Sequence, residues 1–272
     1  MTGLSVEAIA RARSSEHLGR PVIFFDRVGS TNDVASRRAA AGEAEGLLIV
    51  ADEQTAGRGR MGRSWRSPKG AGLLFSLLLR PPIPATRAAQ LTMCLGLGAV
   101  EGIEGVTGLS PALKWPNDLL LDGRKLGGML TDLRTAGFQV QYAVLGLGLN
   151  VNAVPSDLAA VSISLSAVLG RAVDRVELLA EILARCEAWY GRLLAQPATD
   201  ESIHTAWAAR LDTLNRDVTV STTEGQLHGR ALGVSPEGAL LVEGENGRIW
   251  AVWGGDVALH DLRLGSSPYA VL

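Results

Sequence analysis

The segment GRGRMGRSWRSPKG, residues 57–70, combines four arginines, one lysine, four glycines and one tryptophan without an acidic residue. We call it the arginine loop. Glycine lets backbone N–H groups approach an anion, and guanidinium offers a rigid fork of donors, so the composition suits a phosphate-bearing ligand. From Gln54 to Val100 there is no Asp or Glu, which makes this positive field local in a chain of net charge −2. A solvated flexible loop and an RGG-like nucleic-acid contact are alternative interpretations.

Two further motifs carry polar chemistry, and each has a simpler structural interpretation. KWPNDLLLDGRKLGG, residues 114–128, places two lysines, an amide and carboxylates around a tight hairpin, but Lys114 and Asp118 could form a mere surface ion pair. GLGLNVN, residues 146–152, could be a strand whose glycines allow close backbone approach. Neither GxxxxGK[ST] nor a helix-opening GxGxxG occurs, so the two common phosphate loops are excluded.

These motifs lie between segments that predict a mixed sheet flanked by helices. Apolar strands are expected at residues 21–26, 47–51 and 72–80, and the arginine loop follows the second of them directly. VGSTND supplies N-caps for a helix through residue 41, and helical patterns cover residues 86–105 and 156–211. Asp122-Gly123 predicts a two-residue hairpin, which leads into a meander of strands over residues 125–133 and 138–152. The expected fold class is α+β.

The pattern changes from Asp217 onward to short alternating segments separated by turns. This spacing is typical of a small all-β barrel. We therefore expect two domains, residues 1–213 and residues 214–272.

Composition favours a globular protein of a reducing compartment. The 272 residues are 47% hydrophobic and 20% charged, which is ordinary for a packed chain. The two cysteines, Cys94 and Cys186, fall within apolar helical patterns and are expected to be buried free thiols. Neither a signal peptide nor a membrane span is evident, since the apolar run from Leu73 to Leu79 is short and interrupted by Ser76. We expect a cytoplasmic protein.

The order VGSTND, DEQTAGRGRMGRSW, KWPNDLLLDGRKLGG and GLGLNVN resembles the signature of the biotin protein ligases over about residues 20–155. The resemblance implies a catalytic domain like that of class II aminoacyl-tRNA synthetases, followed by an SH3-like barrel. It also implies two reactions: biotin and ATP give biotinyl-5′-AMP with Mg²⁺, and the biotinyl group then passes to a lysine of a biotin carboxyl carrier domain. Lipoate-type ligation and a nucleic-acid-binding module remain alternatives.

The resemblance assigns roles to residues of this chain. The expected biotin site contains Ser30, Thr31, Asn32, Gln54, Arg58, Gly59, Arg60, Lys125 and Gly128. The expected nucleotide and adenylate site contains Arg58, Arg60, Arg63, Trp65, Lys125 and Asn150. Lys125, Arg58 and Arg60 are the expected catalytic residues, with Lys114, Asn117 and Asp118 in support and no metal ligands assigned.

Three further expectations accompany these roles. Residues 57–69 should be disordered without ligand and ordered with it, because an acyl-adenylate must be protected from water. Met61 stands where some relatives have another arginine, which leaves the charge of the phosphate site open. About twenty residues precede the first strand, too few for a winged helix-turn-helix, so DNA binding is not expected. An exposed strand edge is compatible with a homodimer, and a monomer is equally open.

Overall fold

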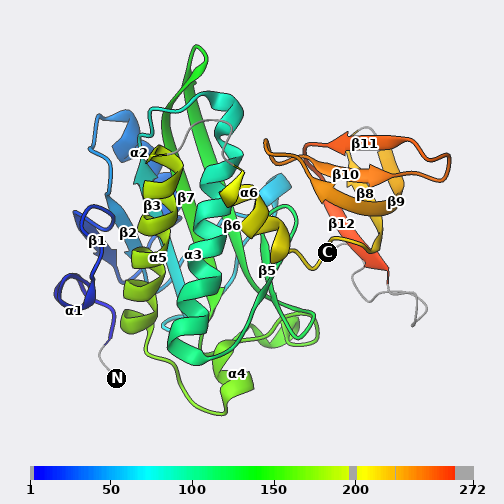
Figure 1. Ribbon diagram of the computed structural model, residues 1–272. Helices are drawn as coiled ribbons and strands as arrows, with labels where there is room; N and C mark the ends of the chain where they lie inside the picture. Colours follow the sequence, from blue (N-terminus) through cyan, green and yellow to red (C-terminus); the bar gives the residue numbers. More distant parts are fainter. Residues whose placement is uncertain (1–2, 196–200, 224, 261–272) are drawn as a thin grey trace.

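A seven-stranded mixed sheet forms the larger part of the chain (Figure 1). The computed structural model describes residues 3–195, 201–223 and 225–260. The strand order is β1-β2-β3-β7-β6-β5-β4, with β1 and β2 parallel and the other neighbours antiparallel. The strands are β1 (Val22–Phe25), β2 (Leu48–Ala51), β3 (Gly72–Leu79), β4 (Ala112–Lys114), β5 (Asp118–Leu121), β6 (Arg124–Ala136) and β7 (Gln139–Asn150). The predicted mixed sheet is confirmed.

Tight turns bring β5, β6 and β7 together. Leu121 pairs with Arg124 across Asp122 and Gly123, whose φ angles are 51° and 71°. Positive φ at both central residues is what a type I′ hairpin requires, so the predicted turn is present. The hairpin of β6 and β7 projects beyond the rest of the sheet (Figure 1).

Helices cover both faces of this sheet. Three short 3₁₀ helices lie along the chain among these elements: η1 (Arg60–Gly62), η2 (Ala85–Arg87) and η3 (Ser156–Leu158). The helical pattern expected over residues 156–211 is divided into separate helices; the α-helix that ends at Leu169 is capped by Gly170, whose φ is 67°. The α-helices are α1 (Val6–Ala12), α2 (Thr31–Ala40), α3 (Ala89–Thr107), α4 (Leu165–Leu169), α5 (Arg175–Ala195) and α6 (Ser202–Ala209). Within the described ranges, none is long and apolar enough to cross a membrane.

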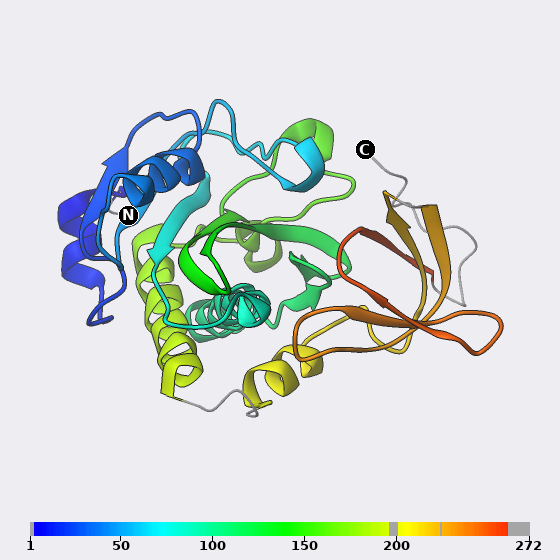
Figure 2. The ribbon, with the colours of Figure 1, turned by 90° about the horizontal axis from the view of Figure 1, so that it is seen from above.

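The two faces of the sheet are covered differently. Phe75 and Leu147 face α3 and α5 and belong to the main core. Leu78 and Val144 face the opposite way and pack with Ala35 of α2 in a smaller cluster. Figure 2 shows α3 and α5 on one side of the sheet, with α2 and the arginine loop on the other. The arginine loop therefore covers sheet surface that α2 leaves free.

A second, five-stranded antiparallel sheet lies beside the main body (Figure 1). Its order is β11-β10-β9-β8-β12, and one face is buried with Val218, Val220, Val242 and Leu259. Trp115 donates its indole N–H to Gly238 O at 2.9 Å, which joins the two sheets. The strands are β8 (Asp217–Thr222), β9 (Gly225–Val234), β10 (Leu240–Glu243), β11 (Ile249–Val252) and β12 (Asp256–His260). The all-β unit is confirmed, while its boundary at residues 213/214 stays a prediction.

The two cysteines are free and buried, as expected. Cys94 lies on α3 and Cys186 on α5, at the contact between the helices. A β-carbon on Gly98 would overlap Cys186, so the glycine permits close packing here. Burial raises the pKa of Cys94 to about 12. Both thiols are therefore inert core groups.

Candidate active site

A cavity of about 640 Å³ lies on the face of the main sheet opposite α3 and α5. Its floor is formed by β6 and β7, and its roof by the arginine loop. Every residue that the sequence assigned to a site lines it: Ser30, Thr31, Asn32, Gln54, Arg58, Gly59, Arg60, Arg63, Trp65, Lys114, Asn117, Asp118, Lys125, Gly128 and Asn150. Folding thus brings the four sequence motifs to one place.

A buried polar network forms the end of the cavity at the N-terminus of α2. Ser30 caps this helix, accepting from Asp33 N, and leaves Thr31 and Asn32 on the first turn, both nearly inaccessible. Gln54 Oε1 accepts from Thr31 N at 2.7 Å and from its hydroxyl at 3.0 Å. These bonds connect the N-terminus of α2 to the segment that follows β2 and fix the direction of each polar group.

Ser76 completes this network, although the sequence did not assign it to the site. It is fully buried on β3, and its hydroxyl lies within donating distance of Thr31 Oγ1, at 2.8 Å, and of Asn32 Oδ1, at 2.6 Å. Because the hydroxyl has one hydrogen, it donates to one of these two acceptors at a time. Asn32 Nδ2 in turn donates to Asp132 Oδ2 at 3.1 Å. The signal available was a single polar residue inside an otherwise apolar strand, because a buried hydroxyl needs a partner.

Glycines on β6 and β7 leave room at the floor of the cavity for neighbouring side chains. A β-carbon on Gly146 would overlap the amide of Asn32, and one on Gly148 would lie 2.5 Å from the ring of Trp65. The same atom on Gly128 would be 3.4 Å from Asp118 Oδ1 and 3.5 Å from Trp65. Gly146 and Gly148 of the GLGLNVN motif therefore make room for the side chains of Asn32 and Trp65. A glycine-softened strand without a role in the site would not require these contacts.

The arginine loop is a narrow hairpin with a left-handed tip. Arg58 and Ser64 form a bridge, and Gly59 N donates to Arg63 O at 2.7 Å. Met61 and Gly62 have φ angles of 54° and 76°. Left-handed backbone costs a non-glycine residue on the order of 1 kcal/mol, so Met61 strains the tip of the loop. Its side chain is 57% exposed.

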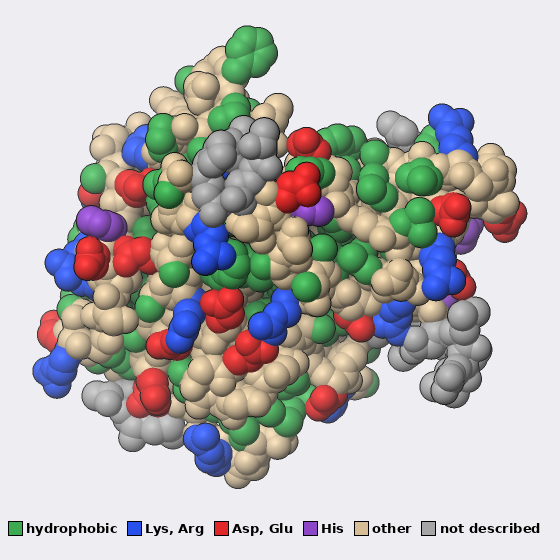
Figure 3. All heavy atoms as spheres, in the orientation of Figure 1, with side chains coloured by type: hydrophobic (Ala, Val, Ile, Leu, Met, Phe, Trp, Pro, Cys, Tyr) green, Lys and Arg blue, Asp and Glu red, His purple; other side chains and the backbone are tan. Residues whose placement is uncertain are grey.

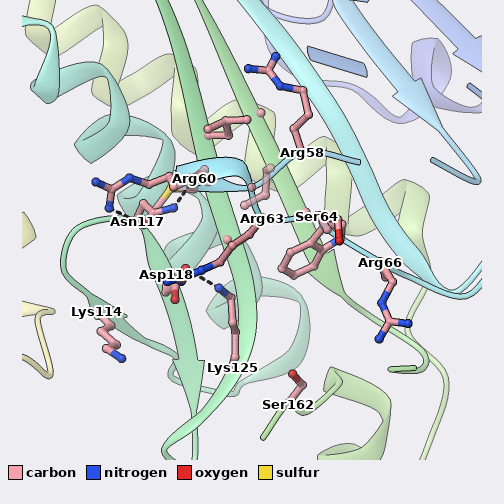
Figure 4. A pocket seen from close by; sticks show the side chains of 18 of the residues that line it. Arg58, Arg60, Arg63, Ser64, Arg66, Lys114, Asn117, Asp118, Lys125 and Ser162 are labelled. Carbon is pink, nitrogen blue, oxygen red and sulfur yellow. Dashed lines mark hydrogen bonds and ion pairs between the residues drawn. The ribbon is translucent and has the colours of Figure 1, made fainter. Parts of the chain in front are cut away.

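Carboxylates bind most of the cationic side chains of this loop. Arg58 donates to Asp132 Oδ2 at 3.0 Å and Oδ1 at 3.1 Å, and to Asp33 at 2.8 Å. The bond to Asp132 and the second carboxylate raise the pKa of Arg58. In Figure 4 its guanidinium points away from Lys125 and Asp118. Arg58 lines the cavity, but the structure does not bring its charge to the other expected catalytic groups.

Arg60 is held differently, by neutral acceptors. It donates to Asn117 Oδ1 at 3.3 Å (Figure 4) and to Gly255 O at 3.4 Å. Burial lowers the pKa of Arg60, partly offset by the carboxylates Asp256 and Asp118. A half-buried guanidinium without a bidentate carboxylate partner has a strong tendency to bind an anion.

Lys125 and Asp118 face each other in the middle of the cavity (Figure 4). Lys125 Nζ lies 2.8 Å from Asp118 Oδ1 and 5.9 Å from the ring centre of Trp65. Asp118 therefore orients Lys125. Lys114 also lines the cavity; burial lowers its pKa, and the nearby carboxylate of Asp118 partly offsets this shift.

Two buried polar atoms that line the cavity have no hydrogen-bond partner. They are Asn150 Oδ1 and Trp65 Nε1, and Asn150 Nδ2 donates to Lys125 O at 3.4 Å. Buried polar groups are nearly always paired, so unpaired ones in a cavity indicate positions where ligand atoms bind. An acceptor and a donor so arranged suit a polar heterocycle.

The C-terminal sheet supplies one wall of the cavity, although the sequence assigned none of its residues to the site. Ser221, Asp256, Val257 and Ala258 contribute to it, and Asp256 forms an ion pair with Arg63. A similar pair joins Arg66 to Asp157 on the other side of the loop. Acidic and basic side chains are also interspersed over the wider surface shown in Figure 3. The charge of the arginine loop is therefore met by partners from several parts of the fold.

Two family models match this chain. The biotin/lipoate A/B protein ligase family matches residues 24–150, and the biotin protein ligase C-terminal domain matches residues 213–259. The first match contains all the assigned site residues, and the second contains the wall formed by Asp256.

Similar proteins cover most of the chain. The bifunctional ligase/repressor BirA of Bacillus subtilis is 36% identical over 260 residues, which are 94% of this chain and 79% of that protein. The biotin–[acetyl-CoA-carboxylase] ligase of Paracoccus denitrificans is 35% identical over 82% of this chain and 94% of its own length. A solved biotin protein ligase from Aquifex aeolicus, in complex with biotin and ATP, superposes with a TM-score of 0.75 at 29% identity, covering 89% of this chain and 99% of that one. On sequence and on fold, the chain belongs to the biotin/lipoate A/B protein ligase family.

Proposed function

We propose that this protein is an ATP-dependent biotin protein ligase. In the first reaction a carboxylate oxygen of biotin attacks the α-phosphorus of ATP, the bond to the β-phosphate oxygen breaks, and pyrophosphate leaves. In the second, the neutral amine of a carrier lysine attacks the acyl carbon, the bond to AMP breaks, and the amine loses a proton. The supporting observation is one cavity in which Lys125 and Arg60 lie beside the unpaired Asn150 Oδ1.

The two ends of the cavity suit the two substrates. The network of Ser30, Thr31, Asn32 and Gln54 offers directed donors and acceptors, which the neutral ureido ring of biotin requires. Trp65 and Asn150 would bind the adenine of ATP. Lys125 lies between these ends, where the carboxylate meets the α-phosphate, so its charge would stabilise the transition state.

The arginines supply positive charge on the side of the phosphates. Arg60 and Arg63 would bind the triphosphate and then the adenylate, while Gly59 lets the backbone of the loop approach the biotin carboxylate. Arg58 forms ion pairs with Asp132 and Asp33. It would either anchor the base of the loop through these pairs, or release the two carboxylates and bind the ligand instead. Lys114 and Asn117 support Arg60 and Lys125.

Mg²⁺ is compatible with this site. It keeps much of its water and usually binds through few carboxylates together with substrate phosphates. Asp118 and Asp256 are the carboxylates among the lining residues, and since Asp256 pairs with Arg63, Asp118 would hold the ion. Groups of three or more potential metal ligands are not found among the described residues, which suits an ion that arrives with the nucleotide. When bound, Mg²⁺ offsets the repulsion between two anionic substrates.

The partner in the second reaction would be a biotin carboxyl carrier domain. The named Paracoccus relative acts on acetyl-CoA carboxylase, which supports a carrier of that kind. Within the described part of the chain, β6 from Leu130 onward pairs only with β7. The other edge of this stretch pairs with no strand of the described ranges and would bind a strand of a carrier or of a second copy.

Biotin-dependent exchange of labelled pyrophosphate into ATP tests this function. The wild type should exchange with biotin and Mg²⁺, and lipoate should not replace biotin. Exchange supported by lipoate and not by biotin would favour a lipoate protein ligase, the other kind of enzyme in this family. A folded protein that exchanges with neither acid would contradict the proposal.

A further inference from the structure

One guanidinium connects the two ends of the arginine loop. The chain leaves β2 through Asp52 and returns to the sheet at Gly72, the first residue of β3. Arg175, on the first turn of α5, donates through Nη1 to Asp52 Oδ1 at 2.8 Å and to Gly72 O at 3.0 Å. A single atom with two hydrogens thus bridges both stems of the loop.

This bridge is well shielded from solvent. The side chains of Arg175 and Asp52 are 12% and 19% exposed, which contrasts with 43% for Arg58 and Arg63 in their ion pairs. Gly70 N also donates to Asp52 O at 3.1 Å, which closes the stems from the backbone. Exposed pairs contribute little, whereas removing one partner of a buried pair leaves a charge uncompensated. Among the ion pairs described for the loop and its stems, the Arg175–Asp52 pair is therefore the least exposed.

The start of α5 also holds the strand end that carries Asn150. Asn152 Nδ2 donates to Val173 O at 3.0 Å, and Val173 N donates to Asn152 Oδ1 at 2.9 Å. Asn152 N donates to Ala71 O at 2.8 Å, which joins the same strand end to the returning stem. The loop and the expected nucleotide-reading residue therefore share one support, two positions before Arg175.

We propose that Arg175 is a positioning residue for adenylate formation and retention. By fixing both stems, it makes the loop close with Trp65 over Gly148 and Arg60 beside Asn117. Arg175 acts through Asp52 and Gly72 and needs no contact with substrate. The inference rests on the proposed ligase function, because its consequence is protection of the adenylate: water that attacks the acyl carbon releases biotin and AMP without modifying a carrier.

The first test compares leakage with transfer in Arg175→Gln, Asp52→Asn and the double variant. AMP formed per carrier lysine biotinylated should rise about tenfold in each, since a buried charged hydrogen bond is lost. The double variant should be no worse than Arg175→Gln, because that substitution already removes the contact with Asp52. Arg185→Gln is the matched control on α5, where Arg185 pairs at the surface with Glu181 at 2.7 Å. A merely destabilising effect would lower both products and leave their ratio unchanged.

The second test needs no catalysis. Hydrogen exchange of the Gly59 and Trp65 amides, which donate to Arg63 O and Gly57 O, reports closure of the loop. With biotin bound, these amides should exchange about tenfold faster in Arg175→Gln than in the wild type, because the same buried charged hydrogen bond is lost. Arg175→Lys serves if the glutamine variant does not fold, since lysine keeps the positive charge but its shorter side chain does not bring a donor to the position of Nη1.

The outcomes separate the two proposals. Absence of pyrophosphate exchange in the wild type overturns the ligase function, while the amide measurement still decides the role of Arg175. Normal exchange with unchanged leakage and unchanged amide protection in folded variants overturns the positioning role alone.

Discussion

Arg63 of the arginine loop forms an ion pair with Asp256 of β12, so the roof of the cavity is attached to the C-terminal sheet. The pair is partly exposed, at 43% and 29% for the two side chains, and contributes little stability by itself. Its importance is electrostatic: a bound triphosphate would compete with Asp256 for Arg63.

We predict that Arg63→Ala and Asp256→Asn affect ATP differently. Arg63→Ala should raise KM for ATP about tenfold, because a charged hydrogen bond to phosphate is worth about 1.5–3 kcal/mol. Asp256→Asn frees Arg63 and should leave KM unchanged or lower. Pyrophosphate exchange at varied ATP measures both. Equal increases in KM would mean that the pair serves only to anchor the loop.

Lys125→Ala should abolish most adenylate formation without unfolding the protein. Loss of a group that stabilises developing charge typically reduces kcat by about 10²–10³. Asp118→Asn should cause a smaller loss, since it leaves Lys125 in place but poorly oriented. Lys69→Ala is the control, because Lys69 pairs with Asp26 at 2.7 Å on the exposed part of the same loop. Single-turnover formation of AMP-linked biotin is the measurement, and near-wild-type rates in Lys125→Ala would contradict this assignment.

The glycine floor predicts a contrast between two alanine substitutions. Gly146→Ala should destabilise the fold by about 1–3 kcal/mol, because its β-carbon would displace the buried Asn32. Gly148→Ala should mainly hinder closure of the loop, since Trp65 can move away. Urea unfolding and pyrophosphate exchange distinguish them. Gly233→Ala, with Leu241 4.0 Å from the new atom, is the control expected to be neutral.

The left-handed tip of the arginine loop predicts a stabilising change. Met61→Gly should relieve strain on the order of 1 kcal/mol and favour the hairpin, because glycine adopts positive φ freely. Slower exchange of the Gly59 amide is the expected result. Met61→Val, a β-branched residue in the same conformation, should do the opposite, and identical exchange in both variants would argue against strain at this position.

Glu187 predicts a pH-dependent contribution to stability. Burial opposes its ionisation, but backbone N–H groups of Leu18, His17 and Glu16 donate to it and together lower its pKa. A lowered folded pKa means that the contribution is present above the unfolded value of about 4.3 and is lost as pH falls through the folded pKa.

Glu187→Gln should therefore cost about 1 kcal/mol in the free energy of unfolding at neutral pH. The difference from the wild type should vanish at pH values below the folded pKa. Urea titrations over that range provide the test, and Glu177→Gln, an exposed position on α5, is the control. A difference that persists in acid would show that charge is not its source.

Much of the candidate site was predictable because its chemistry is concentrated in short motifs. Strand and turn signals around Asp122-Gly123 placed Lys125 on a hairpin, and the charge of residues 57–70 indicated an anion site. Ser76, Asp132 and Asp256 were missed, since each is an ordinary strand residue whose role depends on what lies opposite it. The direction of Arg58, toward Asp132 and Asp33, was equally unavailable from composition.

The sequence by itself determined the residue types, the order of the elements and the family resemblance, because these depend on local spacing and periodicity. Only the tertiary structure decided which carboxylate meets which cation, that glycines admit Asn32 and Trp65, and that Arg175 bridges Asp52 and Gly72. The physical reason is that such contacts join residues far apart along the chain. Their distances follow from the packing of whole elements, which no single segment encodes.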